Sequence, residues 1–279
     1  MNKNIMMNGK YLNEMRVTLV QMDTVWRDTA ANIARFESLV DHVDTDLIVL
    51  PEMWSTGFID DPLTIAEYEH ESTALAAMQS LAVRKQTAVC GSLACRTLAQ
   101  PQQAERGPVE AYATECHNRC YFVWPDGHYV SYDKRHLFAP GGEGRYYTAG
   151  QTAVVARYRG WSFLLAVCYD LRFPVWLRYG GKGGTYDAII CVANWPQQRQ
   201  RVWQTLTEAR AIENQSYVIA VNRTGQGGGL CYNGGSRIVD SRGEIVTELD
   251  AAEQTATTTL LLEPQQRFRQ KFPVLADRD

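Results

Sequence analysis

One stretch constrains this chain more than any other: residues 161–176, WSFLLAVCYDLRFPVW. The apolar run from Phe163 to Val167 is typical of a strand buried on both faces. It stops at Cys168, and Pro174 stands where proline fits the first turn of a helix, because its missing N–H costs nothing there. The stretch predicts a thiol at the exit of a buried strand, just ahead of a helix N-terminus. Such a helix end favours thiolate, the reactive form, although most free cysteines act as small buried hydrophobes.

The whole chain sets the broad class. Its 279 residues carry a net charge of −3 and no basic stripe, so we expect no nucleic-acid partner. No apolar run reaches roughly 18 residues, so nothing is expected to span a membrane. The N-terminal residues MNKNIMMNGKYLNE lack the apolar core of a secretion signal, which favours a cytoplasmic location.

The cysteines agree with a reducing compartment. They are odd in number and scattered through strand-like segments, so a disulfide framework is not expected. Cys116, His117 and Cys120 raise the question of a metal, but their segment alternates as a strand and no second pair at zinc-like spacing follows, so we expect none. The seven are Cys90, Cys95, Cys116, Cys120, Cys168, Cys191 and Cys231.

Strands and helices alternate through the first third of the chain. RVTLVQM (16–22), DLIVLPE (46–52) and TAVCGSLAC (87–95) read as strands. Between them, residues 29–43 form an amphipathic helix with Ile33, Phe36 and Val40 on one face, and 67–86 have helical spacing. This alternation is typical of an α/β fold.

The rest of the chain adds hairpins to this pattern. A polar loop (99–111) precedes two strands (112–124 and 128–134) joined by the turn PDG. A helix over 198–215 is expected to face inward with Val202, Leu206, Ala209 and Ile212. Buried strands flank this helix, and a hairpin and a last strand follow them. We predict a mixed-sheet sandwich with outer helices in one domain (15–263), an N-terminal extension (1–14) and a C-terminal tail (264–279).

Three polar residues end three different strands: Glu52, Lys134 and Cys168. Ligands and catalytic groups in α/β sheets gather at such carboxyl ends. A thiol needs a base, a carboxylate among apolar neighbours can act as one, and an ammonium can stabilise an oxyanion. Alone, Glu52 is an ordinary strand-end carboxylate and Lys134 an ordinary surface cation. Together the three predict a site for acyl transfer.

The segments around these residues, LPEMWSTGF, YDKRHLF and CYDLRFPVW, resemble the three catalytic motifs of the nitrilase superfamily, in the same order. VANWPQQR, ARAIENQSYVIAVNR and SRIVDSRGEIV are most similar to its ω-amidase branch. The resemblance spans about residues 15–262. It implies an α/β fold, an α-β-β-α sandwich with two mixed sheets and outer helices, and a homodimer paired across a helix face.

The resemblance also implies roles for individual residues. Glu52 matches the general base, Lys134 the oxyanion lysine and Cys168 the nucleophile. Glu143 falls where the family has a second glutamate that positions the lysine and the attacking water. The N–H of Tyr169 matches the other oxyanion donor. The chemistry implied is two-step hydrolysis through a cysteine thioester, with no metal and no cofactor.

The ω-amidase branch implies a small amide substrate, a short dicarboxylic acid monoamide such as 2-oxoglutaramate or 2-oxosuccinamate. Its free carboxylate needs a cation when buried, and the planar fork of arginine suits it best. Arg145 and Arg172 are the candidates, although Arg172 also fits a structural ion pair with Asp170. Trp195, in VANWPQQR, is expected beside the substrate.

Other interpretations remain open. The same motifs suit an aliphatic amidase, a carbamoylase or a nitrilase. A papain-like hydrolase would pair Cys168 with His136, the one histidine near a motif. A non-catalytic scaffold would need none of these groups. The segment 226–235 has glycine where relatives often have aspartate, so the shape of this loop is not predicted.

Overall fold

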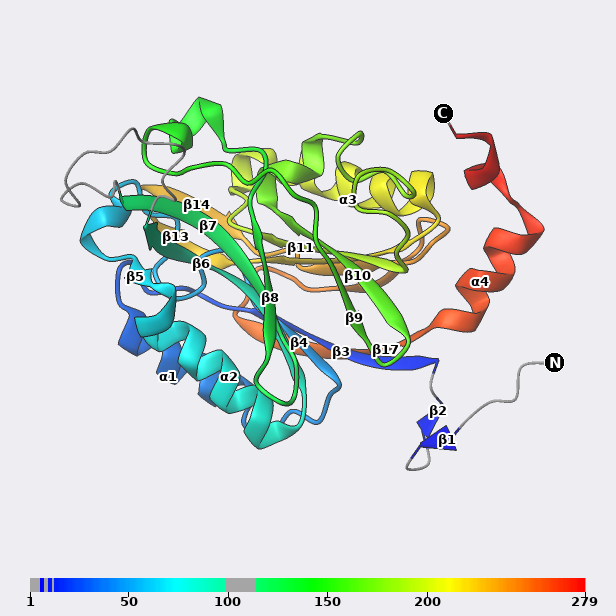
Figure 1. Ribbon diagram of the computed structural model, residues 1–279, viewed down its shortest axis with the longest axis horizontal. Coiled ribbons are helices and arrows are strands. Elements are labelled where there is room, and N and C mark those ends of the chain that lie inside the picture. The colour runs from blue at the N-terminus through cyan, green and yellow to red at the C-terminus, as the bar shows by residue number, and fades with distance from the viewer. Residues whose placement is uncertain (1–5, 8–9, 12, 99–113, 279) are drawn as a thin grey trace, which may run out of the picture.

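Two sheets stack face to face, with α1 (Thr29–Val40) and α2 (Thr73–Lys85) outside one sheet and α3 (Gln200–Asn214) outside the other (Figure 1). The structure, a computed structural model, describes residues 6–7, 10–11, 13–98 and 114–278. Most of the predicted N-terminal extension and the polar loop at 99–111 therefore lie outside the described residues. The layer order confirms the predicted α-β-β-α sandwich.

The first sheet has the order β17-β3-β4-β6-β7-β8, with β5 also paired to β6. β3, β4 and β6 run parallel, and the outer pairings are antiparallel. Parallel central strands follow from the strand–helix alternation, because each helix carries the chain back to the starting edge. The strands are β3 (Glu14–Gln21), β4 (Leu47–Val49), β5 (Glu67–Tyr68), β6 (Ala88–Leu98), β7 (Thr114–Val123), β8 (Tyr129–Asp133) and β17 (Gln254–Leu261).

The second sheet repeats this plan in the order β16-β15-β12-β11-β10-β9. β10, β11 and β12 run parallel, and the remaining pairings are antiparallel. Its strands are β9 (Val155–Tyr158), β10 (Trp161–Val167), β11 (Ala188–Ala193), β12 (Tyr217–Asn222), β15 (Arg237–Val239) and β16 (Ile245–Glu248). Two small hairpins, β1 (Met6–Met7) with β2 (Lys10–Tyr11) and β13 (Thr224–Gly227) with β14 (Leu230–Asn233), stand apart from both sheets.

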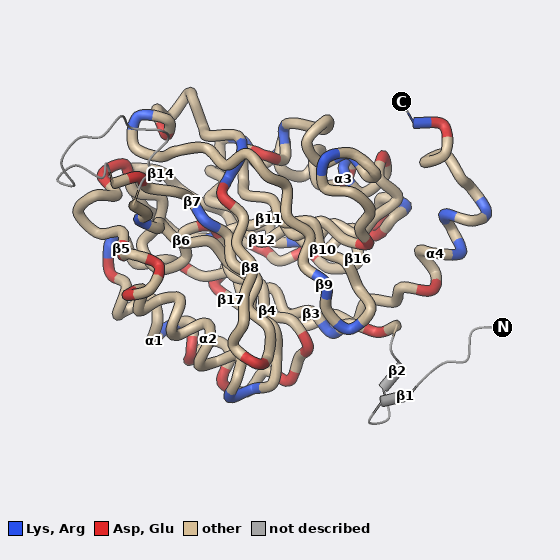
Figure 2. Tube along the Cα trace, in the orientation of Figure 1, with Lys and Arg blue, Asp and Glu red and all other residues tan. Residues whose placement is uncertain are grey.

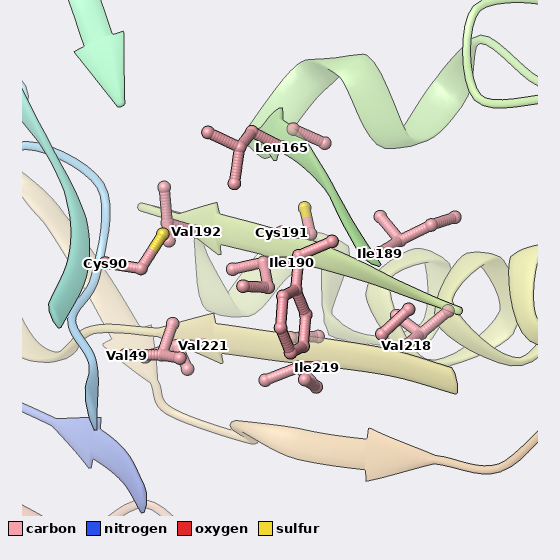
Figure 3. Packing of buried hydrophobic residues seen from close by; sticks show 14 of the residues in the cluster. Val49, Cys90, Leu165, Ile189, Ile190, Cys191, Val192, Val218, Ile219 and Val221 are labelled. Carbon is pink, nitrogen blue, oxygen red and sulfur yellow. The ribbon is translucent and has the colours of Figure 1, made fainter. Parts of the chain in front are cut away.

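Strand alternation decides which core each side chain joins. Leu47 and Val49 of β4 point between the two sheets, whereas Ile48 points toward α1 and α2. The core between the sheets includes Val49, Cys90, Ile190 and Ile219 (Figure 3). Each fully buried aliphatic side chain contributes about 1.5–3 kcal/mol. This packing fixes the strand ends that carry the site.

The face of α3 that packs inward differs from the prediction. Trp203, Thr207 and Ala211 are buried, whereas Ile212 is 53% exposed. The indole of Trp203 decides the rotation of the helix, because it is fully buried and its Nε1 donates to the carbonyl of Gly235 over 2.8 Å. The stripe formed by Val202, Leu206, Ala209 and Ile212 is therefore turned partly toward solvent.

The segment after residue 263 begins as a helix, α4 (Leu262–Lys271). Gln265 donates to the carbonyl of Asp187 over 2.7 Å, and Arg269 donates to the carbonyl of Tyr186 over 3.0 Å. The predicted C-terminal tail is thus tied to the body of the protein over its first turns. Over the described chain, Lys and Arg are interspersed with Asp and Glu (Figure 2).

Candidate active site

The strand ends singled out in the sequence meet in one pocket. Glu52 follows β4 and Lys134 follows β8 in the first sheet, and Cys168 follows β10 in the second. The pocket has a volume of about 330 Å³, which suits a small ligand. Its other lining residues are Trp26, Phe58, Asp60, Phe138, Gly141, Tyr169, Arg172, Asn194, Trp195, Pro196, Arg199, Gly228, Leu230 and Tyr232.

Lys134 lies between two carboxylates. Its Nζ is 3.0 Å from Glu52 Oε1 and 2.9 Å from Glu143 Oε2, and all three side chains are at most 1% exposed. Burial acts to lower the pKa of Lys134, but the carboxylates of Glu143 and Glu52 outweigh it and raise that pKa well above its ordinary value. Lys134 is therefore a fixed positive charge in the pocket wall.

Glu143 comes from η4 (Glu143–Arg145), a single turn in the glycine-rich loop. Its side chain accepts hydrogen bonds from Lys134 Nζ and from the backbone N–H of Phe138. Burial raises the pKa of Glu143, and the charge of Glu52 adds to this, while the ammonium of Lys134 acts against it. Glu143 does not line the pocket, so it acts on the pocket through Lys134.

Cys168 has a backbone φ of +45°, in the left-handed region that non-glycine residues seldom adopt. It begins η5 (Cys168–Arg172), and Pro174 lies in a turn rather than in an α-helix, so the helix expected there was predicted wrongly. The cause is Asp170, whose carboxylate accepts from the N–H of Val167 over 3.0 Å and closes the chain into a tight turn.

The pKa of the Cys168 thiol also differs from the prediction. Burial, followed by the carboxylate of Glu52, raises the pKa of Cys168 well above its ordinary value, and Lys134 offsets only part of the shift. The expectation that a helix dipole favours thiolate was therefore wrong. The resting sulfur holds its proton and needs a base to remove it.

Two residues next to this turn pair with each other instead of with the nucleophile. His136 Nδ1 is 2.8 Å from Asp170 Oδ1, and the imidazole stacks on Phe173 with ring centroids 3.8 Å apart. Asp170 also accepts a hydrogen bond from the hydroxyl of Tyr132 over 2.8 Å. His136 is thus committed to Asp170, which argues against a papain-like Cys–His pair.

The sequence reasoning missed two asparagines that hold Glu52. Asn194, at the end of β11, donates its backbone N–H to Glu52 Oε2 over 2.7 Å and its side-chain amide to the Glu52 carbonyl over 2.9 Å. Asn118, within β7, donates to Glu52 Oε1 over 2.7 Å. The strand-end signal that found Cys168 also applies to Asn194. It does not apply to Asn118, which lies inside its strand.

Arg172 and Trp195, both expected beside the substrate, line the pocket. The guanidinium of Arg172 lies over the rings of Trp195 and Tyr169, 5.3 and 5.9 Å from their centroids. Within the described part of the chain it forms no ion pair and no hydrogen bond. Asp170 is taken by His136, Tyr132 and backbone N–H groups, so the alternative ion pair between Arg172 and Asp170 does not form.

Arg145 was predicted to bind the substrate, but Arg199 lines the pocket instead. Arg145 is exposed and lines a separate hollow with Asp61, Thr114 and Tyr146 rather than the pocket. Arg199, which the sequence reasoning did not single out, lines the pocket, and its guanidinium lies 5.1 Å from the centroid of the Phe138 ring.

The segment 226–235, whose shape the sequence left open, includes the β13–β14 hairpin, which borders the pocket through Gly228, Leu230 and Tyr232. Gly228 has φ +56°, and a Cβ there would lie 2.7 Å from the Trp26 ring. A side chain at this position would push the hairpin off Trp26. Glycine at this position thus lets the pocket rim close against the indole.

Known proteins share both the sequence pattern and the fold. The profile of the family described as carbon–nitrogen hydrolase matches residues 16–270. The chain belongs to the carbon–nitrogen hydrolase family. "Omega-amidase YafV" of Yersinia enterocolitica is 40% identical over 96% of this chain and 98% of its own length. "2-oxoglutaramate amidase" of Paenarthrobacter nicotinovorans is 34% identical over 88% of this chain and 83% of its own.

A solved member of the superfamily has the same architecture. XC1258 from Xanthomonas campestris, a carbon–nitrogen hydrolase superfamily protein with an arsenic adduct in its active site, superposes with a TM-score of 0.86 at 35% identity. The match covers 95% of this chain and 97% of that one. The predicted superfamily and its sandwich fold are thereby confirmed, as is the prediction of a hydrolase acting on carbon–nitrogen bonds.

Two negative findings concern the described residues only. Among them, no helix is long and apolar enough to cross a membrane. Nor do these ranges hold a group of three or more His, Cys, Asp or Glu arranged to bind a metal ion. Cys116 and His117, considered as ligands from the sequence, are buried on β7, where His117 bonds to Thr97 and to the Thr148 carbonyl.

Proposed function

We propose that this carbon–nitrogen hydrolase is an ω-amidase, which releases ammonia from the terminal amide of short dicarboxylic acid monoamides such as 2-oxoglutaramate and 2-oxosuccinamate. The observation that carries the proposal is a half-buried guanidinium, that of Arg172, in the same pocket as Cys168 and without an anionic partner among the described residues. The relatives named omega-amidase and 2-oxoglutaramate amidase support it.

The proposed reaction starts with proton transfer. Glu52 takes the proton of Cys168, whose raised pKa keeps it a thiol at rest, and the resulting thiolate attacks the amide carbonyl carbon. The Lys134 ammonium and the N–H of Tyr169 stabilise the oxyanion of the tetrahedral intermediate. Tyr169 stands in the first turn of η5, where the N–H groups have no partner within the helix and can point to a ligand.

The intermediate then collapses to a thioester. Glu52 returns the proton to the departing nitrogen, the C–N bond breaks and ammonia leaves. Water then attacks the thioester, with Glu52 accepting its proton. The C–S bond breaks to release the carboxylic acid, and Glu52 passes the proton to the sulfur of Cys168, which restores the thiol. Glu143 positions Lys134 throughout, since both of its oxygens lie within about 3.1 Å of the ammonium. These steps use only groups of this chain, the substrate and water.

The free carboxylate of the substrate is assigned to the arginine end of the pocket. An unpaired buried charge costs several kcal/mol, and a guanidinium satisfies a carboxylate through two parallel hydrogen bonds. Arg172 lies four residues beyond Cys168 and is held in place by two rings. Trp195 supplies an apolar ring surface next to this cation in the same pocket. Arg145 lies outside the pocket and has no part in this assignment.

An ammonia-release assay tests the proposal. The substrates are 2-oxosuccinamate, 2-oxoglutaramate, the methyl ester of each, propionamide, a carbamoyl-amine and an aliphatic nitrile. We expect both free acids to give the highest kcat/KM and the esters to lose most of it, because the ester removes the charge that Arg172 binds. Equal efficiency on propionamide or on the nitrile refutes the ω-amidase assignment and leaves the family membership intact.

The same assay separates the remaining alternatives. Preference for propionamide, the carbamoyl-amine or the nitrile identifies an aliphatic amidase, a carbamoylase or a nitrilase. No ammonia from any substrate would favour a non-catalytic scaffold. The fully buried cluster of Glu52, Lys134 and Glu143 argues against a scaffold. Burying three charged groups costs free energy, and a scaffold gains nothing in return for this cost.

We further propose that the protein acts as a homodimer in the cytoplasm. The partly exposed apolar stripe of α3, which ends at Ile212, supports pairing across this helix. Ile212→Glu should therefore shift the mass found by sedimentation equilibrium from two copies to one. A wild-type mass of one copy contradicts the dimer. The seven free cysteines agree with a reducing compartment.

A further inference from the structure

One side-chain amide touches both carboxylates of the active site. Asn118 is fully buried on β7, and its Nδ2 lies 2.7 Å from Glu52 Oε1 and 3.3 Å from Glu143 Oε1. The amide nitrogen carries two hydrogens, one for each acceptor. Its backbone carbonyl also accepts the N–H of Lys134 over 2.9 Å. Asn118 therefore contacts all three charged members of the cluster.

A neighbouring serine fixes which way this amide points. Ser92 Oγ, on the adjacent strand β6, lies 2.9 Å from Asn118 Oδ1 and 2.9 Å from the backbone nitrogen of Met53. The Met53 nitrogen can only donate, so the serine oxygen accepts from it and keeps its own hydrogen available to donate to Oδ1. The amide oxygen thus faces Ser92 and the NH₂ group faces the two carboxylates. The reverse orientation would set an oxygen against two anions.

The charges of the cluster explain why such a donor is needed. Glu52 and Glu143 share one ammonium, that of Lys134, and all three side chains are at most 1% exposed. Two carboxylates beside a single cation compete for a proton, and a hydrogen bond to the charged form opposes that uptake. Within the described ranges, the backbone N–H groups of Asn194 and Phe138 each donate to only one of the two carboxylates.

We propose that Asn118 is a positioning residue, which holds Glu52 and Glu143 aligned on Lys134 so that Glu52 is oriented to accept the proton of Cys168. The inference rests on the proposed catalytic roles but not on the identity of the amide. The other titratable groups that interact with the cluster are Cys120, Tyr147, Cys168, Cys191 and Tyr232. None of them donates a hydrogen bond to both carboxylates.

Three variants test the inference. Asn118→Leu keeps the volume and removes the donor. Asn118→Asp adds a carboxyl group, which imitates the amide when protonated and adds a third negative charge when ionised. Asn214→Leu is the matched control, because Asn214 is equally buried but bonds to Tyr179 and Arg210, away from the pocket. Each is assayed for kcat and KM from about pH 5.5 to pH 9 on the best amide substrate of the wild type.

The expected results differ in sign as well as in size. Asn118→Leu should lower kcat about 10–10²-fold, below the loss typical of a direct oxyanion donor, with KM changed less than about threefold. The acid limb of its pH profile should move to higher pH, because a carboxylate that loses a hydrogen-bond donor stays protonated up to a higher pH. For Asn118→Asp, activity relative to wild type should be highest at low pH and fall as pH rises. Asn214→Leu should lower the melting temperature without altering kcat or the pH profile.

A purely structural role for Asn118 predicts a different outcome. Asn118→Leu would then resemble Asn214→Leu, and the ratio of Asn118→Asp to wild type would not vary with pH; either result overturns the inference. If Asn118→Leu does not fold, Ser92→Ala is tested instead. Removing the Ser92 hydroxyl frees the Asn118 amide to rotate, so kcat should fall in the same direction but by less. An unchanged kcat in Ser92→Ala counts against the proposal in the same way.

A second readout needs no substrate and separates this inference from the proposed function. The rate at which iodoacetamide alkylates Cys168, followed by mass spectrometry of the peptide, reports how readily Glu52 takes the thiol proton. We expect Asn118→Leu to slow this alkylation at neutral pH and Asn214→Leu to leave it unchanged. Equal rates in both variants refute the role of Asn118 even if no amide tested is a substrate.

Discussion

The two ends of the pocket differ in how completely their charges are paired. At the catalytic end, Glu52, Lys134 and Glu143 are buried, and each accepts or donates several hydrogen bonds within the protein. Elsewhere in the pocket lining, at what we call the recognition end, Arg172 and Arg199 lie against aromatic rings and have no anionic partner among the described residues. The charges of the catalytic end are paired before a ligand binds, whereas the positive charges of the recognition end need an anion from a ligand to pair with.

The difference follows from the task of each end. Groups that act on a transition state must already be in place, because reorganising them during the reaction raises the barrier. Groups that recognise a ligand gain affinity by leaving a charge unpaired until the ligand binds. The rings of Tyr169, Trp195 and Phe138 orient the two guanidiniums without neutralising them, as cation–π contacts do.

The largest effect should come from the sulfur atom. Cys168→Ala should reduce ammonia release by at least about 10⁴-fold, the scale seen when a nucleophile is removed. Cys168→Ser should be nearly as inactive, because a carboxylate is a weak base for an alcohol. The melting temperature should hardly change, since the substitution leaves the Asp170 bonds of the turn in place. Activity of Cys168→Ala above about one per cent of wild type rules out a thioester.

The second largest effect should come from Glu143. Glu143→Gln keeps the shape but removes the charge that holds Lys134, and we expect kcat to fall by about 10²–10⁴-fold. The thioester should still form slowly in this variant, whereas Glu52→Gln should form none. Rapid-quench mass spectrometry of Cys168 distinguishes the two. Glu71→Gln, at an exposed carboxylate, serves as the control, and a wild-type rate in Glu143→Gln would make Glu143 an ordinary loop carboxylate.

The catalytic end was easier to read from the sequence than the recognition end, for a physical reason. Glu52 and Lys134 lie just beyond strands of the first sheet and Cys168 just beyond a strand of the second, and parallel strands bring such ends to one edge of each sheet. Asn118 was not identified from the sequence because it lies inside β7. A polar residue within an alternating strand is usually interpreted as a solvent-facing position. Only the fold shows that this position faces the cluster.

The recognition end depends on rotations and turns that a linear pattern does not encode. Arg145 and Arg199 both lie in short turns, and the direction of each turn decides which arginine enters the pocket. The inward face of α3 was misjudged because the aliphatic stripe lies next to Trp203, whose larger surface outweighs it. The turn after Cys168 depends on a carboxylate, Asp170, whose partners lie far away in sequence.

The third prediction concerns the carboxylate of the substrate. Arg172→Gln should raise KM for 2-oxosuccinamate about 10–10²-fold, since a charge-assisted hydrogen bond contributes about 1.5–3 kcal/mol, and should change kcat less than about threefold. Its KM for the methyl ester should hardly move, because the ester has no charge to lose. Arg201→Gln, an exposed neighbour of Arg199 on α3, is the control. A fall in kcat at constant KM would place Arg172 at the catalytic end instead.

The smallest effect should come from Arg199. Its guanidinium lies over one ring, that of Phe138, whereas Arg172 is held by two, so Arg199 is less firmly oriented toward a ligand. It adds positive charge to the pocket, where a partly exposed cation attracts an anion over a distance that salt screens.

Arg199→Gln should therefore lower kcat/KM for 2-oxosuccinamate only about 3–10-fold at low salt, because exposed charge pairs contribute about 0.2–1 kcal/mol and rarely more. The difference from wild type should shrink as the ionic strength rises from about 0.01 to 0.5 M, whereas the defect of Arg172→Gln should persist, since a contact pair is screened far less. If the loss of kcat/KM in Arg199→Gln is as large as that in Arg172→Gln and does not depend on salt, both arginines bind the carboxylate directly. The recognition end would then be as firmly organised as the catalytic end, and the contrast between them would apply only to the unliganded protein.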